Sequence, residues 1–496
     1  MTPNHVDVLI VGAGLSGIGA GCHLAQKCPQ KSFAILESRG AMGGTWDLFR
    51  YPGIRSDSDM FTLGYSFAPW KAAKSIADGP SILQYIHDTA REHRIEDRIR
   101  YHRRAVAARW SGDEQQWTVD VQDTESGTVE QMTASFVFGC TGYYRYDEGF
   151  TPDFPGLEDF GGTFLHPQHW PEDLDYKGKK VVVIGSGATA MTLVPAMAKD
   201  AEHVTMLQRS PTYVVSLPAE DPVAKVVQKL LPPKRAYALL RWKNVLMTQA
   251  SYALSQRFPT FMGDFFRRGV KLHLPKDYDV DTHFKPDYGP WDQRVCLVPD
   301  ADLFKVLRRG QATMVTDRIA RFTTTGITLE SGAELEADIV ISATGLNLLL
   351  AGGIELEVDG EPVDFATLVG YKGLMFSGLP NLAMSIGYTN ASWTLKCDLT
   401  CEWVCRLLNH MDAHDYAVVA PGQPGPEIER LPFIDLKSGY VTRSIDRFPK
   451  QGSEAPWRLA QNYARDVLLL KRGELDDGTL EFTPAGAPAT KEPVAA

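Results

Sequence analysis

Two glycine-rich segments of this chain have the spacing that lets a backbone turn close around a pyrophosphate. The first runs Gly12, Ala13, Gly14, Leu15, Ser16, Gly17, and the second runs Gly185, Ser186, Gly187, Ala188, Thr189, Ala190. Each follows an apolar, strand-like run and leads into a helix-like stretch, as at the start of a βαβ unit. Because the N–H groups at a helix N-terminus attract anions, we expect each segment to bind one dinucleotide.

Opposite charges downstream of the two segments predict that the two dinucleotides differ. Glu37 stands twenty residues after Gly17, where a carboxylate accepts hydrogen bonds from ribose hydroxyls and repels a 2′-phosphate. That site therefore fits FAD or NAD. Arg209 stands nineteen residues after Ala190, and its guanidinium suits the 2′-phosphate of NADPH. A surface arginine at a strand end is the alternative interpretation of Arg209.

A nicotinamide and a flavin held by one chain imply hydride transfer from NADPH to FAD. The loop after the first segment supplies further candidate flavin contacts, namely Gly44, Thr45, Trp46 and Asp57. A flexible turn, a large ring and a carboxylate would suit the face of an isoalloxazine. The alternative is a glycine- and proline-rich surface loop in which Trp46 caps a core.

The alternation of strands and helices indicates an α/β fold with two Rossmann-like dinucleotide-binding domains, one for FAD and one for NADP. We expect strands at residues 6–11, 32–36, 180–184 and 204–208. The predicted FAD-binding domain comprises residues 1–145 and 380–483, and the predicted NADP-binding domain comprises residues 146–217 and 290–379. Residues 218–289 are predicted to form a helical insertion in the NADP domain, with a long helix over 234–258. Residues 484–496 are Pro/Ala-rich and predict a disordered tail.

The predicted insertion is rich in basic residues and poor in acidic ones. Its cations are Lys225, Lys229, Lys234, Arg235, Arg241, Lys243, Arg257, Arg267, Arg268 and Lys271. Such a patch would make weak contact with an anionic membrane surface or steer NADPH toward its site. A solvated helical face is the plainer interpretation.

Composition and charge indicate which binding partners and which cellular compartment to expect for this protein. The 496 residues carry a net charge of −10, which disfavours nucleic acid as a partner. We find no signal peptide and no membrane-spanning run, so we expect a cytoplasmic protein. The seven cysteines form no metal-binding pattern and no redox pair beside a flavin. Cys397, Cys401 and Cys405 recur every four residues, which predicts one buried row on a helix.

A longer motif lies between the two dinucleotide segments. Phe160, Gly162, His166, Trp170 and Pro171 fit the pattern F-x-G-x-x-x-H-x-x-x-W-P, and residues 43–57 fit G-G-x-W-x-x-x-x-Y-P-G-x-x-x-D. Both patterns resemble those of type I Baeyer–Villiger monooxygenases, the class B flavoprotein monooxygenases. Residues 46–57 and 388–396 look most like the mycobacterial ethionamide-activating monooxygenase group.

The resemblance implies roles for individual residues. Arg294 matches the active-site arginine that steadies a C4a-peroxyflavin, and Asp57 matches the carboxylate that positions this arginine. His166 matches a histidine that links domain movement to catalysis. Without the resemblance, Arg294 would be interpreted as a solvated loop arginine. Many relatives carry Lys before the arginine, whereas this chain has Gln293, so its preference for NADPH depends more on Arg209.

The function implied is NADPH- and O2-dependent insertion of one oxygen atom beside the carbonyl of linear or aryl-alkyl ketones. Oxygenation of sulfides or thioamides at sulfur is the expected side activity. One alternative is a flavin-containing monooxygenase that acts mainly on S or N. The other is a non-enzymatic redox sensor, in which Arg294 and Asp57 would have no purpose. Oligomeric state is left open by the sequence.

Overall fold

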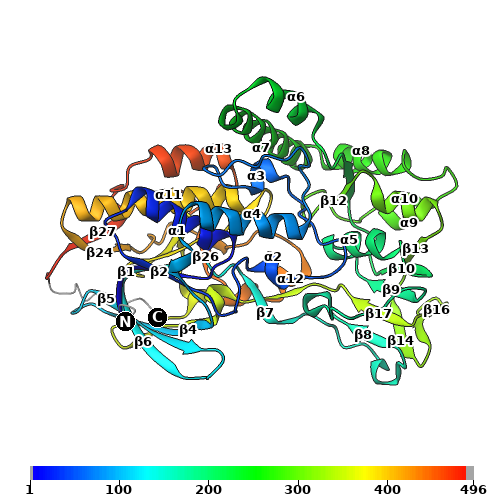
Figure 1. The fold of residues 1–496 in the computed structure, drawn as a ribbon, viewed down its shortest axis with the longest axis horizontal. Coiled ribbons are helices and arrows are strands. Elements are labelled where there is room, and N and C mark those ends of the chain that lie inside the picture. Colours follow the sequence, from blue (N-terminus) through cyan, green and yellow to red (C-terminus); the bar gives the residue numbers. More distant parts are fainter. Residues whose placement is uncertain (1–3, 488–496) are drawn as a thin grey trace.

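The computed structural model describes residues 4–487 and contains two sheets that lie side by side, each with its own helices (Figure 1). The first sheet has the order β20-β19-β4-β5-β6-β1-β2-β3, and β23 pairs with β6. Its strands are β1 (His5–Val11), β2 (Phe33–Leu36), β3 (Ile99–Arg100), β4 (Arg103–Ser111), β5 (Gln116–Asp123), β6 (Val129–Gly139), β19 (Glu355–Val358), β20 (Glu361–Pro362) and β23 (Leu382–Met384).

The second sheet is parallel and has the order β13-β10-β9-β17-β8. Its strands are β8 (Thr163–Leu165), β9 (Lys180–Ile184), β10 (His203–Gln208), β13 (Ala312–Thr316) and β17 (Ile339–Ser342). The main helices beside it are α5 (Ala188–Met197) and α10 (Asp302–Arg308). A small antiparallel sheet, β14 (Ile319–Thr323), β15 (Gly326–Leu329) and β16 (Glu334–Glu336), leads into β17.

Central strands of both sheets bury both of their faces, which explains their continuous apolar sequences. In β1, Val8 and Ile10 enter one core, while Leu9 and Val11 enter the core on the other face. The second sheet repeats this arrangement, because residues 181 and 183 of β9 enter one core and residues 182 and 184 another. The predicted α/β fold with two Rossmann-like units is therefore confirmed.

The first core is covered by α1 (Leu15–Lys27), α4 (Gly79–Glu92) and α11 (Trp393–Ala413). Gly19 of α1 lets the ring of Tyr65 approach, since a Cβ there would stand 2.9 Å from that ring. Cys397, Cys401 and Cys405 are all buried on α11, as the four-residue spacing predicts. Among residues 4–487, no group of His, Cys, Asp or Glu is arranged to hold a metal ion.

Strand pairing places one segment differently from the predicted domain division. β19 and β20 lie within residues 290–379, which were assigned to the NADP-binding domain, yet β19 pairs with β4 of the first sheet. The chain therefore returns to the first sheet before residue 380. The short sequence Glu355–Val358 does not by itself predict a strand, because the formation of such a strand depends on pairing with its neighbour. Between the two sheets, β7 (Tyr144–Gly149) pairs with β18 (Leu346–Leu348).

The predicted helical insertion contains α6 (Pro222–Leu230), α7 (Pro233–Arg257), α8 (Pro259–Lys271) and α9 (Val280–Phe284), between β11 (Val214–Leu217) and β12 (Cys296–Pro299). Helices α6 and α7 project at the top of Figure 1, whereas α9 lies beside α10. None of the helices within residues 4–487 has the length and apolar character that crossing a bilayer requires.

The remaining elements are small. They are α2 (Thr45–Leu48), α3 (Met60–Leu63), β21 (Gly370–Tyr371), β22 (Met375–Phe376), β24 (Tyr416–Pro421), β25 (Arg430–Pro432), α12 (Gly439–Thr442), β26 (Lys450–Gly452), α13 (Tyr463–Asp466) and β27 (Leu480–Pro484). Strand β27 reaches Pro484, where the predicted disordered tail begins, and residues 488–496 of that tail lie outside the described residues.

Candidate active site

One large cavity, about 1530 Å³ in volume, runs between the two sheets. It is lined by residues of both glycine-rich segments, by the loop of residues 43–58 and by Arg294. This volume exceeds the roughly 300–1000 Å³ of ordinary small-molecule pockets. The cavity is large enough to hold more than one extended ligand.

The first glycine turn is shaped by close backbone contacts. Gly12 has φ +103°, and a Cβ there would stand 2.7 Å from the carbonyl oxygen of Cys140, at the end of β6. Gly17 does not line the cavity; a Cβ there would stand 1.8 Å from the carbonyl oxygen of Gly12. Gly14, Leu15 and Ser16 do line it. The segment therefore divides into residues that face a ligand and a glycine that closes the turn.

Glu37 lies at the end of β2 and faces the cavity. Its carboxylate accepts hydrogen bonds from the N–H groups of Ala13 at 2.9 Å and Arg39 at 3.0 Å. Burial raises the pKa of Glu37, while these hydrogen bonds act in the opposite direction. The buried Glu37 carboxylate suits the ribose of FAD, and the glycine turn at Gly12 leaves room for its pyrophosphate. The residues beside the first sheet therefore fit this cofactor.

The second turn repeats the first. Gly185 has φ +133°, and a Cβ there would stand 2.3 Å from the carbonyl oxygen of Ala343, just after β17. Gly187 has no neighbour within 4 Å of such a Cβ, so its face is open toward the cavity. Ser186, Ala188 and Thr189 line the cavity, whereas Ala190 is buried in the core.

Arg209 follows β10 at the corresponding edge of the second sheet, where it is exposed and lines the cavity. A second cation, Arg318 after β13, also lines the cavity there, although no sequence motif marks it. Two guanidinium groups and an open glycine turn fit a dinucleotide that carries a 2′-phosphate. Gln293 also lines the cavity.

The loop of residues 43–57 joins the two halves of the cavity. Gly43 and Gly44 have φ of +118° and +56°, and Gly44, Thr45 and Trp46 line the cavity as α2 begins. Trp46 also packs against the first core. It therefore has both a surface toward the cavity, where a flavin contact was predicted, and the core contact of the alternative interpretation. Arg55 pairs with Asp302 at the start of α10, which ties the loop to the second sheet.

Arg294 and Asp57 meet across the seam between these halves. Nη1 of Arg294 lies 3.7 Å from Oδ2 of Asp57, which is an ion pair too long for a hydrogen bond. The side chains remain 34% and 38% exposed, so both are accessible from the cavity. Burial by itself would lower the pKa of Arg294, but neighbouring Tyr440 and the Asp57 carboxylate raise it well above its usual range. The guanidinium is therefore a permanent positive charge.

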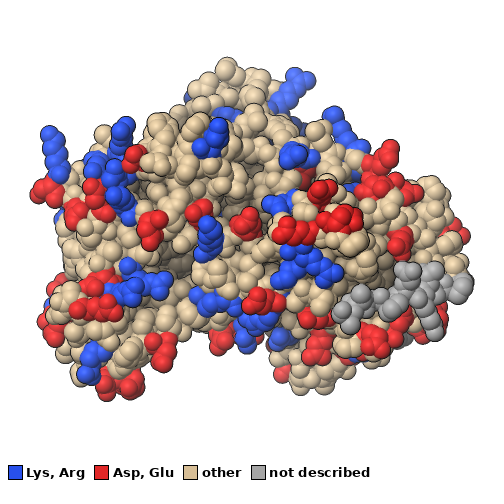
Figure 2. Space-filling view, turned by 180° about the vertical axis from the view of Figure 1, so that it is seen from behind, with Lys and Arg blue, Asp and Glu red and all other residues tan. Residues whose placement is uncertain are grey.

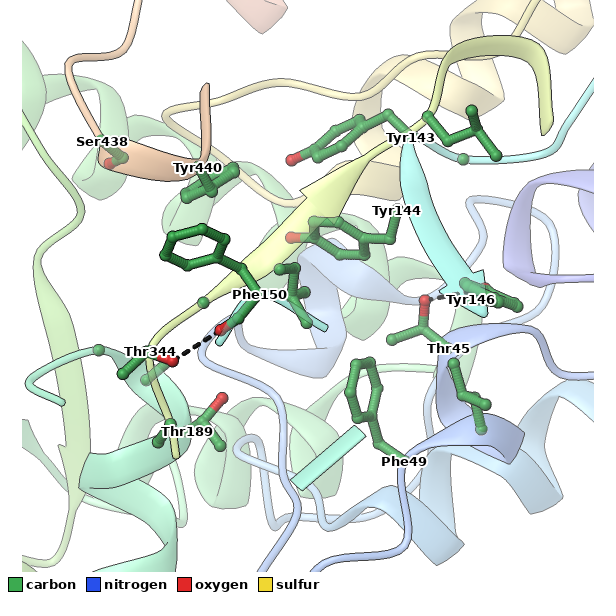
Figure 3. Close-up of a pocket in the computed structure, with 18 of the residues that line it drawn as sticks. Thr45, Phe49, Tyr143, Tyr144, Tyr146, Phe150, Thr189, Thr344, Ser438 and Tyr440 are labelled. Atoms are coloured by element: carbon green, nitrogen blue, oxygen red, sulfur yellow. Dashed lines mark hydrogen bonds between the residues drawn. The ribbon is translucent and has the colours of Figure 1, made fainter. Parts of the chain in front are cut away.

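An aromatic wall that no sequence motif predicts lies beside this charge. Tyr143, Tyr144, Phe150 and Tyr440 line the same cavity, and Figure 3 shows them facing a common space with Phe49. Burial raises the pKa values of Tyr144 and Tyr440 to about 12, so both phenols stay protonated near neutral pH. Tyr440 comes from α12, far along the chain, and no sequence motif pointed to it.

The motif residues Phe160, Gly162, His166, Trp170 and Pro171 do not line this cavity, although His169 between them does. Nε2 of His166 donates to the carbonyl oxygen of Gly345 at 3.0 Å, and Nδ1 accepts from the N–H of Gln168 at 3.2 Å. His166 thus connects the motif to the segment just before β18. Gly162 permits close packing, because a Cβ there would stand 2.4 Å from the carbonyl oxygen of Asp338.

The other motif side chains pack locally. The ring of Phe160 lies 5.8 Å from that of Phe322, Trp170 packs against the core that contains α5, and Pro171 is exposed. Among residues 4–487, the lining of the large cavity includes none from 218–289. Helix α7 of the insertion packs on α3 of the first domain, whereas α8 packs on β11 and α9 packs on β13 of the second sheet.

Comparison with known proteins places the chain in a family. A family model for flavin-binding monooxygenase-like proteins matches residues 76–351, and one for NAD(P)-binding Rossmann-like domains matches residues 10–72. The chain belongs to the flavin-binding monooxygenase-like family. It is 56% identical to the FAD-containing monooxygenase EthA of Mycobacterium tuberculosis (strain ATCC 25618 / H37Rv), over 98% of this chain and 99% of that protein.

Further relatives have similar coverage. The probable FAD-binding monooxygenase AlmA of Acinetobacter baylyi is 50% identical over 96% of each chain. Among solved structures, an oxidised steroid monooxygenase bound to NADP superposes with a TM-score of 0.76, at 22% identity over 96% of this chain and 99% of that one. An open cyclohexanone monooxygenase gives 0.74, at 20% identity over 97% and 99%. The predicted resemblance to these monooxygenases is confirmed, and this flavin-binding monooxygenase-like chain is an enzyme.

Proposed function

We propose that this flavin monooxygenase binds FAD and NADPH and uses O2 to insert one oxygen atom beside the carbonyl of linear or aryl-alkyl ketones. The net reaction converts ketone, O2, NADPH and a proton into ester, water and NADP⁺. The observation that carries the proposal is the permanent charge of Arg294, held beside Asp57 in a cavity that both glycine turns share.

The chain's own groups would hold the two cofactors at opposite ends of this cavity. Glu37 and the turn at Gly12 would bind the adenosine part of FAD, and Arg209 with the turn at Gly185 would bind NADPH. When bound, the cofactors supply the hydride and the reduced flavin that activates O2. Gly44, Thr45 and Trp46 line the space between these ends and would contact the flavin.

Arg294 is the proposed catalytic residue, and Asp57 positions it. Attack on a ketone places negative charge on the former carbonyl oxygen, and a fixed guanidinium stabilises such charge in a site that excludes water. Tyr143, Tyr144 and Phe150 would exclude water on one side. His166 lies outside the cavity, and its bond to Gly345 supports a role in coupling the two domains.

Oxygenation of a sulfide or thioamide at sulfur is the expected side reaction, because it needs the same cofactors but no anion-stabilising charge on the substrate. A monooxygenase acting mainly on S or N is the competing proposal. The position of Arg294 favours ketones as the main substrates, since a permanent charge would contribute little to attack by a neutral sulfur.

The deciding experiment is mass analysis of products. The FAD-loaded protein would be incubated with NADPH, ¹⁸O2, a series of linear and aryl-alkyl ketones, and a sulfide. Esters that carry one labelled oxygen would support the proposal and rank chain lengths. Sulfoxide without ester would contradict it in favour of S-oxygenation. NADPH consumption that no substrate stimulates, with no product, would favour the redox sensor.

A further inference from the structure

Exposed apolar side chains of this protein gather on the helical insertion. Among the described residues, fourteen of the sixteen large hydrophobic residues that are strongly exposed lie between Leu217 and Leu272. The side chains of Leu230 and Leu272 are 75% and 85% exposed. Exposed apolar side chains concentrated in one segment in this way indicate an interaction site.

These side chains form one outward stripe on each helix. The stripes comprise Val223, Val226 and Leu230 on α6, Leu239, Trp242, Leu246, Met247 and Leu254 on α7, and Phe261 and Phe265 on α8. The spacing of three and four residues places each set on one side of its helix. We call these residues, with Phe258 and Leu272, the outer face. Other residues of the same helices, such as Tyr237 and Phe266, already supply the buried side.

The charge around the outer face is opposite in sign to that of the whole protein. Residues 222–271 contain ten Lys or Arg and a single acid, Asp264, in a chain whose net charge is −10. Among the described residues, no acidic side chain pairs with Lys229, Lys234, Arg235, Arg257 or Arg268, which are all exposed. Figure 2 shows the projecting upper part of the molecule as tan and blue.

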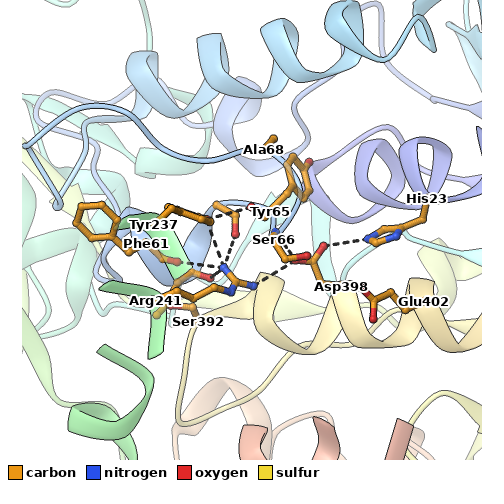
Figure 4. A network of polar contacts seen from close by, with 12 residues as sticks. His23, Phe61, Tyr65, Ser66, Ala68, Tyr237, Arg241, Ser392, Asp398 and Glu402 are labelled. Atoms are coloured by element: carbon orange, nitrogen blue, oxygen red, sulfur yellow. Dashed lines mark hydrogen bonds and ion pairs between the residues drawn. The ribbon is translucent and has the colours of Figure 1, made fainter. Parts of the chain in front are cut away.

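Helix α7 is held firmly with this face outward. Nη1 of Arg241 donates to the carbonyl oxygens of Phe61 at 3.0 Å and Gly64 at 2.7 Å, and Nη2 pairs with Asp398 at 3.2 Å (Figure 4). The Tyr237 hydroxyl donates to the carbonyl oxygen of Tyr65 at 3.0 Å. A rotation of α7 that buried its outer stripe would break these buried contacts, so the stripe stays exposed in the isolated protein.

We propose that the outer face docks on an anionic bilayer surface. Leucine and phenylalanine side chains would enter the boundary between headgroups and acyl chains, while the unpaired lysines and arginines would meet lipid phosphates. The ring of Trp242 lies 5.5 Å from that of Tyr463 and would stay at the edge of this contact. A second copy of this chain is a poor occupant, because it would bring two strongly basic surfaces together. The large cavity lies away from the outer face and stays accessible while the protein is docked.

The test is flotation of the full-length protein with vesicles of phosphatidylcholine and phosphatidylglycerol, compared with phosphatidylcholine alone. We expect binding only to the anionic vesicles, with loss at high salt. Each basic residue neutralised should weaken binding about fivefold. Lys229→Gln with Arg235→Gln should therefore cost about 25-fold, and Phe261→Ser with Phe265→Ser should reduce binding further.

Matched controls come from the rest of the surface. Leu468 lies outside the insertion and is 58% exposed, and Lys199 is also exposed. The substitutions Leu468→Ser and Lys199→Gln should therefore leave vesicle binding unchanged. Circular dichroism and NADPH oxidation in solution would check that every variant is folded. Equal binding to neutral vesicles, no binding to either kind, or dimerisation that the phenylalanine variant abolishes would each overturn the proposal.

Discussion

The guanidinium of Arg241 in α7 and the carboxylate of Asp398 in α11 form an ion pair at 3.2 Å whose side chains are only 6% and 4% exposed. His23 of α1 binds the other oxygen of the same carboxylate, also at 3.2 Å. Next to Asp398, Cys397 contacts Ser16 of the first glycine segment. The helical insertion is thus fastened to the helices that surround the proposed FAD site.

Removing one member of this pair should destabilise the protein strongly. Arg241→Met leaves the Asp398 carboxylate buried without its main cation, and such losses cost about 3–5 kcal/mol. Urea denaturation would measure the change in the free energy of unfolding. Arg241→Met combined with Asp398→Leu should recover much of the loss, because neither charge then remains buried. A single mutant as stable as the wild type would show that the pair contributes nothing.

The same carboxylate should make stability depend on acid pH. Burial would raise the pKa of Asp398, but His23 and Arg241 lower it below the usual value. A depressed pKa in the folded state adds stability above the unfolded pKa of about 3.9, and this stability is lost as the pH falls through the folded value. Unfolding free energies measured between neutral and acid pH should therefore fall more for the wild type than for Asp398→Asn. Parallel curves would contradict this assignment.

Replacing Arg294 should separate reduction from oxygenation. Arg294→Ala removes a preorganised charge, which typically costs roughly 100- to 1000-fold in rate, so ester formation should nearly disappear. Flavin reduction by NADPH under anaerobic conditions should persist, because Arg294 is proposed to act after that step. Stopped-flow absorbance and product analysis would measure the two separately. Equal losses in both steps would indicate a role in cofactor binding instead.

Two glycines of one turn provide a matched pair of substitutions. Gly185→Ala would place a Cβ 2.3 Å from the carbonyl oxygen of Ala343 at φ +133°, so it should destabilise the fold. Gly187→Ala meets nothing within 4 Å and should fold normally. If NADPH approaches that face as proposed, Gly187→Ala should still weaken its binding. Thermal unfolding and KM for NADPH distinguish these effects, and unchanged values for both variants would contradict the proposed site.

Arg209 should determine the preference between the nicotinamide cofactors. A hydrogen-bonded charge pair contributes about 1.5–3 kcal/mol, so Arg209→Ala should raise KM for NADPH roughly 10- to 100-fold and leave KM for NADH nearly unchanged. Steady-state kinetics with both cofactors would measure this. Arg318→Ala is the informative comparison, because Arg318 lines the same part of the cavity. A larger effect from Arg318 would transfer the proposed phosphate contact to that residue.

Local patterns in the sequence were enough to predict both βαβ units. Gly12 and Gly185 are followed by Glu37 and Arg209 at nearly equal spacing, because strand, turn and helix lengths fix the distance to the next strand end. The long helix α7 was also predicted closely, since 234–258 lacks interior breakers. Arg294 and Asp57 lie beside one cavity, and the roles that the resemblance implies for them stay predictions.

Other features depend on contacts between distant segments, which one sequence does not display. Tyr440 reaches Arg294 only because α12 packs beside β18, and β19 is a strand of the first sheet only because β4 accepts it. The sequence did not predict the exposed apolar stripe of α7, and the reason is a different one. A helix with apolar residues on two sides does not reveal which side is covered.

The path of the insertion constrains how the two halves of the molecule can part. The chain leaves the second half after Leu217 and returns to it in α8, whose Val270 enters the core of the second sheet. Between these points, Ala219 accepts hydrogen bonds from Ser75 and Ile76, and Arg241 is buried in the first half. The insertion therefore works as a strap that crosses the seam twice. If a nicotinamide cofactor binds between the halves as proposed, these two crossings would restrict how far the halves can separate to release it.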